Sequence, residues 1–138
     1  MAGALTADEV IAFLDERAEW AVLTSIDRRG FPHSVPLGYF RIGEDVYAGT
    51  HSDTQKVRNL ERDPHASLLI ASAKNSKDWR GVLIQGEIEI VRDDAERLEI
   101  EREGRRQRGV PEEKLPTTPR VGEVMLRLSL QRTISWRF

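Results

Sequence analysis

The chain has 138 residues, of which 39% are hydrophobic and 32% are charged, a composition typical of one globular domain. Its 21 lysines and arginines nearly balance its 23 aspartates and glutamates, and the net charge of -2 indicates no general attraction to nucleic acid or to an anionic membrane. The absence of cysteine excludes disulfides, thiolate metal sites and cysteine nucleophiles. No apolar run approaches the roughly 20 residues of a membrane-spanning helix, and the first residues lack the pattern of a signal peptide, so we expect a cytoplasmic protein.

The first predicted element is a helix that begins after Thr6. Thr6 and Glu9 have the spacing of a capping box, and Leu5 can pack on Val10 as a hydrophobic staple. Apolar residues then recur at helical spacing, and this pattern ends near Arg17.

Alternating or continuous apolar patterns predict six strands, over residues 20–26, 32–40, 45–50, 66–72, 80–91 and 121–136. Residues 27–30 have the composition of a hairpin turn, in which Gly30 supplies the positive φ. A second helix is expected to start at Ser52 or Asp53 and to stop at Pro64. A third is capped by Asp93 or Asp94 and continues to about residue 106, and residues 109–119 form a loop with at most one helical turn.

This order of elements predicts a mainly β fold, an antiparallel barrel with peripheral helices. Residues 1–138 should form one domain, because no linker, repeat or low-complexity tract divides them. A barrel this small fills its interior with side chains. A ligand should therefore bind outside it, where two subunits meet.

The stretch from Thr50 to Lys56 is the strongest local indication of a binding site. Thr50, Ser52 and Thr54 carry hydroxyls between a strand and a helix whose first turn contains Lys56. Free N–H groups at a helix N-terminus, together with hydroxyls and an ammonium, suit a phosphate group. An ordinary capped surface helix is the alternative, and the Asp53 carboxylate would repel an anion unless it points outward.

Other reactive side chains form no recognisable site in the sequence. The three histidines are too scattered for a metal site: His33, His51 and His65. No serine lies in the Gly-x-Ser-x-Gly turn of a hydrolase nucleophile. Trp136 is notable because it lies two residues from the end of the sequence, where a chain frays unless it is held.

Four blocks, in the same order, resemble the pyridoxamine 5'-phosphate oxidase-like split-barrel family. Residues 56–70 (KVRNLERDPHASLLI) resemble the family's Lys-x-Arg-Asn-Leu-x-x-Asp-Pro-x-Ala-Ser element, whose lysine reaches the cofactor phosphate. Residues 30–37 (GFPHSVPL) resemble the strand whose backbone lies against the cofactor ring. Residues 80–86 (RGVLIQG) and 134–136 (ISW) resemble a further strand and the C-terminal aromatic near the cofactor. The resemblance implies a six-stranded antiparallel split β-barrel.

The sequence also departs from the vitamin-B6 oxidases of that family. His33 stands where those enzymes have an arginine, and Gln55 where they have a second phosphate-binding cation. Their C-terminal substrate-binding segment has no counterpart, because this sequence ends at Phe138. True pyridoxamine-phosphate oxidase activity is therefore not expected. The KVRNL form is closer to the branch that includes users of the deazaflavin coenzyme F-420, although FMN binders also belong there.

The resemblance thus implies a homodimeric oxidoreductase that transfers a hydride between a small organic substrate and coenzyme F-420 or FMN, with F-420 slightly favoured. The implied cofactor-binding residues are Val35, Pro36 and Leu37 along the ring, Thr50, Ser52, Thr54, Gln55 and Lys56 around the phosphate, and Arg80 and Trp136, contributed in some arrangements by the neighbouring subunit. The sequence identifies no general acid. Two alternatives stay open: a non-catalytic protein that stores or senses the cofactor, and a haem-binding relative with His33, His51 or His65 as ligand.

Overall fold

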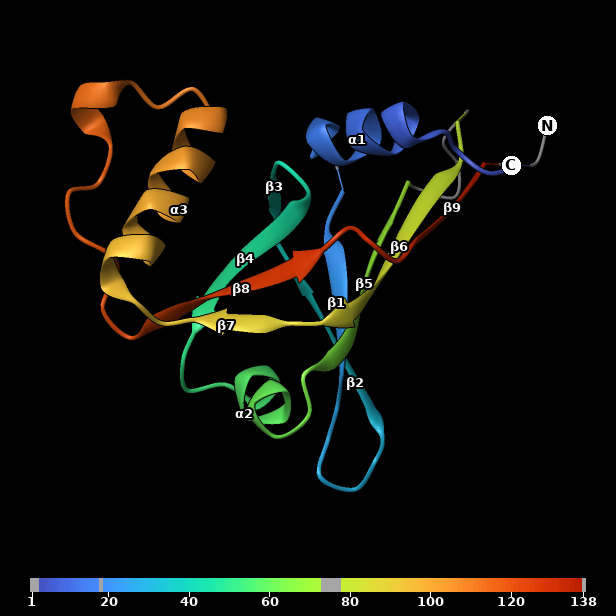
Figure 1. Ribbon diagram of the computed structural model, residues 1–138, viewed down its shortest axis with the longest axis horizontal. Coiled ribbons are helices and arrows are strands. Elements are labelled where there is room, and N and C mark those ends of the chain that lie inside the picture. Colours follow the sequence, from blue (N-terminus) through green and yellow to red (C-terminus); the bar gives the residue numbers. More distant parts are fainter. Residues whose placement is uncertain (1–2, 18, 73–77, 138) are drawn as a thin grey trace.

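The structure, a computed structural model, describes residues 3–17, 19–72 and 78–137 (Figure 1). This part of the chain forms two antiparallel sheets. The strands of the five-stranded sheet, in spatial order, are β2 (Pro32–Leu37), β1 (Ala21–Ile26), β5 (His65–Ala71), β6 (Arg80–Glu87) and β9 (Thr133–Arg137). Those of the four-stranded sheet are β3 (Phe40–Ile42), β4 (Asp45–His51), β8 (Glu123–Ser129) and β7 (Glu89–Val91). The helices are α1 (Ala7–Glu16), α2 (Gln55–Arg62) and α3 (Asp94–Gln107), with a short 3-10 turn at Glu112–Lys114.

The mainly β class with outer helices is confirmed, but the count of six strands was wrong. Three of the predicted strands each divide in two, giving β2 and β3, β6 and β7, and β8 and β9. Each division carries the chain from one sheet to the other. Strands that change sheets bend at the corner, and a run of alternating residues does not reveal where that corner lies.

Apolar side chains from the facing sides of both sheets make the main core. Leu23, Ile70 and Ile84 enter it from the five-stranded sheet, and Val46 and Leu126 from the four-stranded sheet. Each such side chain stabilises the fold by roughly 1.5–3 kcal/mol relative to an exposed position. The core therefore holds the two sheets together. Because its side chains fill the space between the sheets, we expect a ligand site outside it.

The helices occupy three separate places around the sheets (Figure 1). The capping box of α1 is confirmed, since the Thr6 hydroxyl accepts from the Glu9 N–H at 3.1 Å and the Glu9 carboxylate accepts from the Thr6 N–H at 3.0 Å. Asp93 caps α3, which packs on the four-stranded sheet through a second cluster around Phe40 and Ile100. In the view of Figure 1, α1 lies at the top and α2 at the bottom. None of the helices in the described ranges is both long and apolar enough to cross a membrane.

Candidate functional site

The N-terminus of α2 lacks a side-chain cap. Its N-cap residue is Thr54, not Ser52 or Asp53 as the sequence suggested, and no side chain in the described part of the chain accepts from the first-turn N–H groups. The Thr54 hydroxyl instead donates to the His51 carbonyl at 3.1 Å. The free N–H groups and the helix dipole therefore leave a partial positive charge available to an anion.

Lys56 lies in this first turn and is half-buried. Burial lowers the pKa of its ammonium. Across the described ranges, no carboxylate forms an ion pair with Lys56. A partly desolvated cation without a partner, beside a helix N-terminus, favours an anionic ligand such as a phosphate.

Asp53 does not oppose this reading. Its carboxylate is almost fully exposed and forms an ion pair with Arg58 at 2.8 Å. The positive charge of Arg58 therefore compensates the negative charge of Asp53, which lies close to Lys56 in the sequence.

The predicted hydroxyl donors differ in position. Thr50 is buried, on the same face of β4 as Val46 and Ala48 of the main core. Ser52 lies at the surface, where its hydroxyl donates to the Gly122 carbonyl at 3.1 Å. Ser52 and Thr54 are thus beside the start of α2, whereas the Thr50 side chain faces the interior.

Gln55 takes part in a polar chain that attaches α2 to β1. Its amide donates to the Asn59 side-chain oxygen at 2.7 Å, and the Asn59 amide donates to the Ser25 hydroxyl at 3.1 Å. Asn59 and Ser25 are both fully buried. Our sequence analysis did not identify this pair as important, although a polar residue between the inward-facing Val57 and Leu60 was a usable signal.

The predicted ring-binding strand, β2, is at one edge of its sheet. Val35 and Leu37 point toward the core, while Pro36 is exposed. An edge strand leaves one row of backbone groups outside the sheet pairing. Val35 and Leu37 can therefore meet a ligand mainly through backbone atoms, as the resemblance implied.

Arg80 and Trp136 lie elsewhere. Trp136 belongs to β9, at the opposite edge of the sheet from β2, with three strands between them. At the usual strand spacing, this separation is about 19 Å along the sheet. Trp136 lies directly over Gly81 of β6, the residue next to Arg80.

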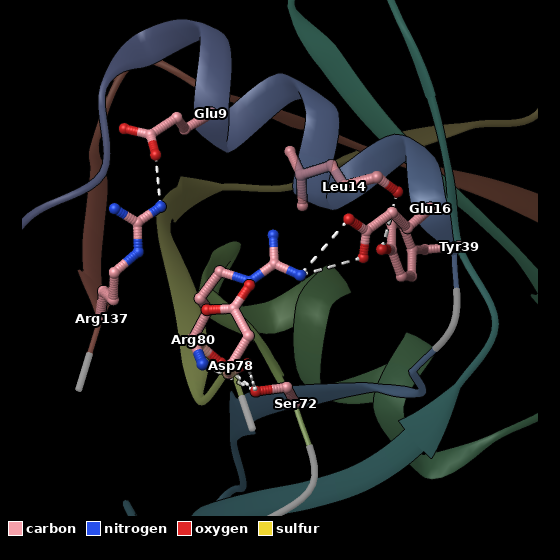
Figure 2. A network of polar contacts seen from close by, with 8 residues as sticks. All are labelled: Glu9, Leu14, Glu16, Tyr39, Ser72, Asp78, Arg80 and Arg137. Atoms are coloured by element: carbon pink, nitrogen blue, oxygen red, sulfur yellow. Dashed lines mark hydrogen bonds and ion pairs between the residues drawn. The ribbon is translucent and has the colours of Figure 1, made fainter. Parts of the chain in front are cut away.

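Arg80 is engaged with α1 and the loop before β6 (Figure 2). Its guanidinium contacts Glu16 at 3.3 Å and Asp78 at 2.8 Å, and lies 4.8 Å from the centre of the Phe13 ring. Within one protomer, the predicted residues thus form two groups. One group lies on or beside α2 and β2, and the other lies on β6 and β9.

The three histidines do not come together. His51 is exposed, and His65 is exposed and contacts Asp63 and Glu87, which raises the pKa of its imidazole, chiefly through the hydrogen bond to Asp63. His33 on β2 is half-buried, and its Nδ1 has no hydrogen-bond partner in the described ranges. Those ranges hold no group of three or more histidine, aspartate or glutamate side chains placed to bind a metal.

Comparison with known proteins gives one family match and several similar structures. A family model described as pyridoxamine 5'-phosphate oxidase matches residues 6–127. A conserved hypothetical protein from Mycobacterium tuberculosis superposes with a TM-score of 0.78 at 23% identity, over 96% of this chain and 86% of its own. A FAD-binding protein from Mesorhizobium loti gives a TM-score of 0.74 at 18% identity, over 100% of this chain and 99% of its own. An F420 reductase gives 0.65 at 19% identity, over 88% of this chain and 93% of its own. At these identities, the superpositions show a shared fold. No curated protein matches significantly.

Proposed function

Because this chain belongs to the pyridoxamine 5'-phosphate oxidase family, we propose that it is an oxidoreductase that binds coenzyme F-420 or FMN by its phosphate and reduces a small organic acceptor. F-420 is the favoured cofactor. The KVRNL form of the motif at residues 56–60 supports that order, as does the fold shared with an F420 reductase.

Lys56 is the observation that carries this proposal. It is a half-buried ammonium without a described ion-pair partner, in the first turn of a helix that no side chain caps. The buried Asn59–Ser25 hydrogen bond fixes α2 against β1, so the position of Lys56 is set before a ligand arrives. Such a site suits a phosphate group, which FMN and F-420 both carry in this part of the molecule.

The proposed orientation runs from α2 to β2. With the phosphate at Lys56, Ser52 and Thr54, the ring system lies along the outer edge of β2 at Val35, Pro36 and Leu37. When bound, the cofactor supplies the hydride. The protein's own part is to hold the phosphate, orient the ring against the β2 backbone and exclude water from one side of it. No described side chain is assigned as a proton donor.

A single protomer provides only half of this pocket. Trp136 is on the edge strand opposite β2, and Arg80 is on the strand beside it, so they complete the proposed site only if a second subunit supplies them. We therefore include a two-fold symmetric homodimer in the proposal, with each cofactor bound between the two chains.

The test is the substitution Lys56→Ala, with Lys114→Ala as the matched control in the exposed 3-10 turn. Losing a charge-assisted contact of roughly 1.5–3 kcal/mol should weaken F-420 and FMN binding by about tenfold or more. Both variants should stay within about 0.5 kcal/mol of wild type in the free energy of unfolding. Binding is followed by cofactor fluorescence, and stability by denaturant unfolding.

Four results would change the proposal. Equal affinities for wild type and Lys56→Ala would place the phosphate elsewhere. Much tighter binding of FMN than of F-420 would reverse the order of the two cofactors. Cofactor binding without turnover of any electron acceptor would favour a storage protein, and a haem absorption spectrum in the purified protein would favour the haem-binding alternative.

A further inference from the structure

Two neighbouring cavities, of about 160 and 190 Å³, share Arg17 and Arg108 in their walls. Arg17 is the C-cap of α1 and Arg108 is the C-cap of α3. The larger cavity is also lined by Glu19, Trp20, Gly38 and Tyr39. Its wall therefore combines two guanidinium groups and two aromatic rings with one carboxylate, that of Glu19.

The two arginines outnumber the one carboxylate, that of Glu19, in the wall of the larger cavity. The carboxylates at the end of α1 are already paired, Asp15 with Arg41 at 2.7 Å and Glu16 with Arg80 at 3.3 Å. Burial, and then the neighbouring Arg108, lower the pKa of Arg17. Neither Arg17 nor Arg108 forms an ion pair within the described ranges. A cation at a helix C-terminus is favourable by itself, but two guanidinium groups that repel each other across one cavity also favour an anion between them.

The backbone at Arg17 supports a role for its side chain. Its φ is 52°, in the left-handed region that glycine or asparagine occupies most readily. Its guanidinium lies 5.7 Å from the centre of the Phe40 ring, which restricts where the charge can go. An arginine is thus held in a conformation that a smaller residue would adopt at lower cost.

The larger cavity is next to the proposed ring position. Gly38 and Tyr39 in its wall directly follow Leu37, the last residue of β2. Trp20 is 70% exposed, although tryptophan is usually covered, and so offers an aromatic face at the same opening. A molecule placed here would reach the ring-binding strand at one end and the arginines at the other.

We propose that Arg17 and Arg108 form an oxyanion site for the carboxylate or phosphate group of the acceptor, with Trp20 against the acceptor's apolar part. This inference rests on the proposed function and names acidic small molecules as its substrate class. Guanidinium groups bind both oxyanions through paired, charge-assisted hydrogen bonds.

The first experiment uses cofactor-free protein and three probes: benzoate, inorganic phosphate and benzamide. Benzamide has nearly the shape of benzoate without its charge. Binding is followed by the NMR shift of the Trp20 indole N–H, which is assigned with Trp20→Phe. Benzoate should shift this signal, and benzamide should bind about tenfold or more weakly. Tighter binding of phosphate than of benzoate would identify a phosphate group as the preferred anion.

The variants are Arg17→Asn, which keeps a residue suited to the left-handed backbone, and Arg108→Asn. The control is Arg132→Asn, in the exposed turn before β9. Each of the first two substitutions should weaken benzoate binding by about tenfold, and the control should leave it unchanged. Equal binding of benzoate and benzamide, no binding of either anion, or no effect of Arg17→Asn and Arg108→Asn would overturn the site.

The substrate role is tested separately with the cofactor-loaded protein. Benzoate should inhibit turnover in competition with the acceptor and not with the cofactor. Lys56→Ala, which binds the cofactor about tenfold or more weakly if the proposed function is correct, should still bind benzoate as wild type does. Benzoate binding that depends on Arg17, in a protein that reduces no acceptor, would overturn the substrate role and contradict the proposed function. Noncompetitive inhibition would overturn the substrate role alone.

Discussion

Trp136 lies so closely over Gly81 that a single methyl group is enough to disturb it. A Cβ added to Gly81 would lie 2.1 Å from Cζ2 of Trp136 and 2.4 Å from its Cε2, far inside van der Waals contact. Glycine is needed here because the Trp136 indole packs directly on the β6 backbone at this position. The position of the one aromatic side chain expected near the cofactor thus depends on a residue with no side chain.

We predict that Gly81→Ala displaces the Trp136 indole and lowers the free energy of unfolding by roughly 1–3 kcal/mol, as overpacking usually does. Tryptophan fluorescence and denaturant unfolding measure both effects. Gly49→Ala is the strand control, since its Cβ would be no closer than 3.8 Å to any neighbouring atom. In a Trp136→Ala background, Gly81→Ala should change the free energy of unfolding only slightly. An equal loss of stability in that background would show that contact with the indole is not the cause.

At the scale of elements, α1 is fastened to the end of the chain by Glu9. The Glu9 carboxylate completes the capping box at Thr6 and also forms an ion pair with Arg137 of β9 (Figure 2). The hydrogen bond from the Thr6 backbone, and then that from Arg137, lower the pKa of Glu9 from 4.5 to about 2. One side chain therefore links the first helix to the last strand.

This shift predicts a pH dependence of stability. A carboxyl group whose pKa is lowered in the folded protein contributes stability above its ordinary pKa and loses it as the pH falls through the folded value. The melting temperatures of wild type and Glu9→Gln should therefore differ most near neutral pH and converge between pH 4.5 and about 2. Glu99→Gln, at an exposed position on α3, is the control. A constant difference over this range would contradict the assignment.

The features that depend on residues close together in the sequence could be predicted from it. The cap of α1 was correct because Thr6 and Glu9 are three residues apart, and the hairpin turn was correct because Gly30 has a φ of 87°. The corners near Gly38 and Ile88 were missed because they depend on which sheet the next strand joins. The same reason separates the two sites: Lys56 lies in a local motif, whereas Arg17 and Arg108 meet only after folding.

At the scale of the whole molecule, the proposed site requires two copies of the chain. The proposed ring-binding strand β2 and the strand β9, which carries Trp136, are the opposite edges of one sheet. A two-fold axis can bring the β2 edge of one protomer to the β9 edge of its partner, and it does so twice. Two identical sites, each with residues from both chains, are the expected result.

Mixing two defective variants tests this arrangement directly. Lys56→Ala and Trp136→Ala should each weaken cofactor binding as homodimers. When equal amounts are unfolded together and refolded, about half of the dimers should be mixed, by random pairing of the two chains. If each site takes Lys56 from one chain and Trp136 from the other, a mixed dimer has one site with both substitutions and one wild-type site. About a quarter of all sites should then bind with wild-type affinity, as measured by cofactor titration. Light scattering checks that the refolded protein is a dimer.

If both residues served the same site from one chain, every site in the mixture would carry a substitution and no wild-type affinity would return. A stable monomer that binds the cofactor tightly would equally contradict the shared site.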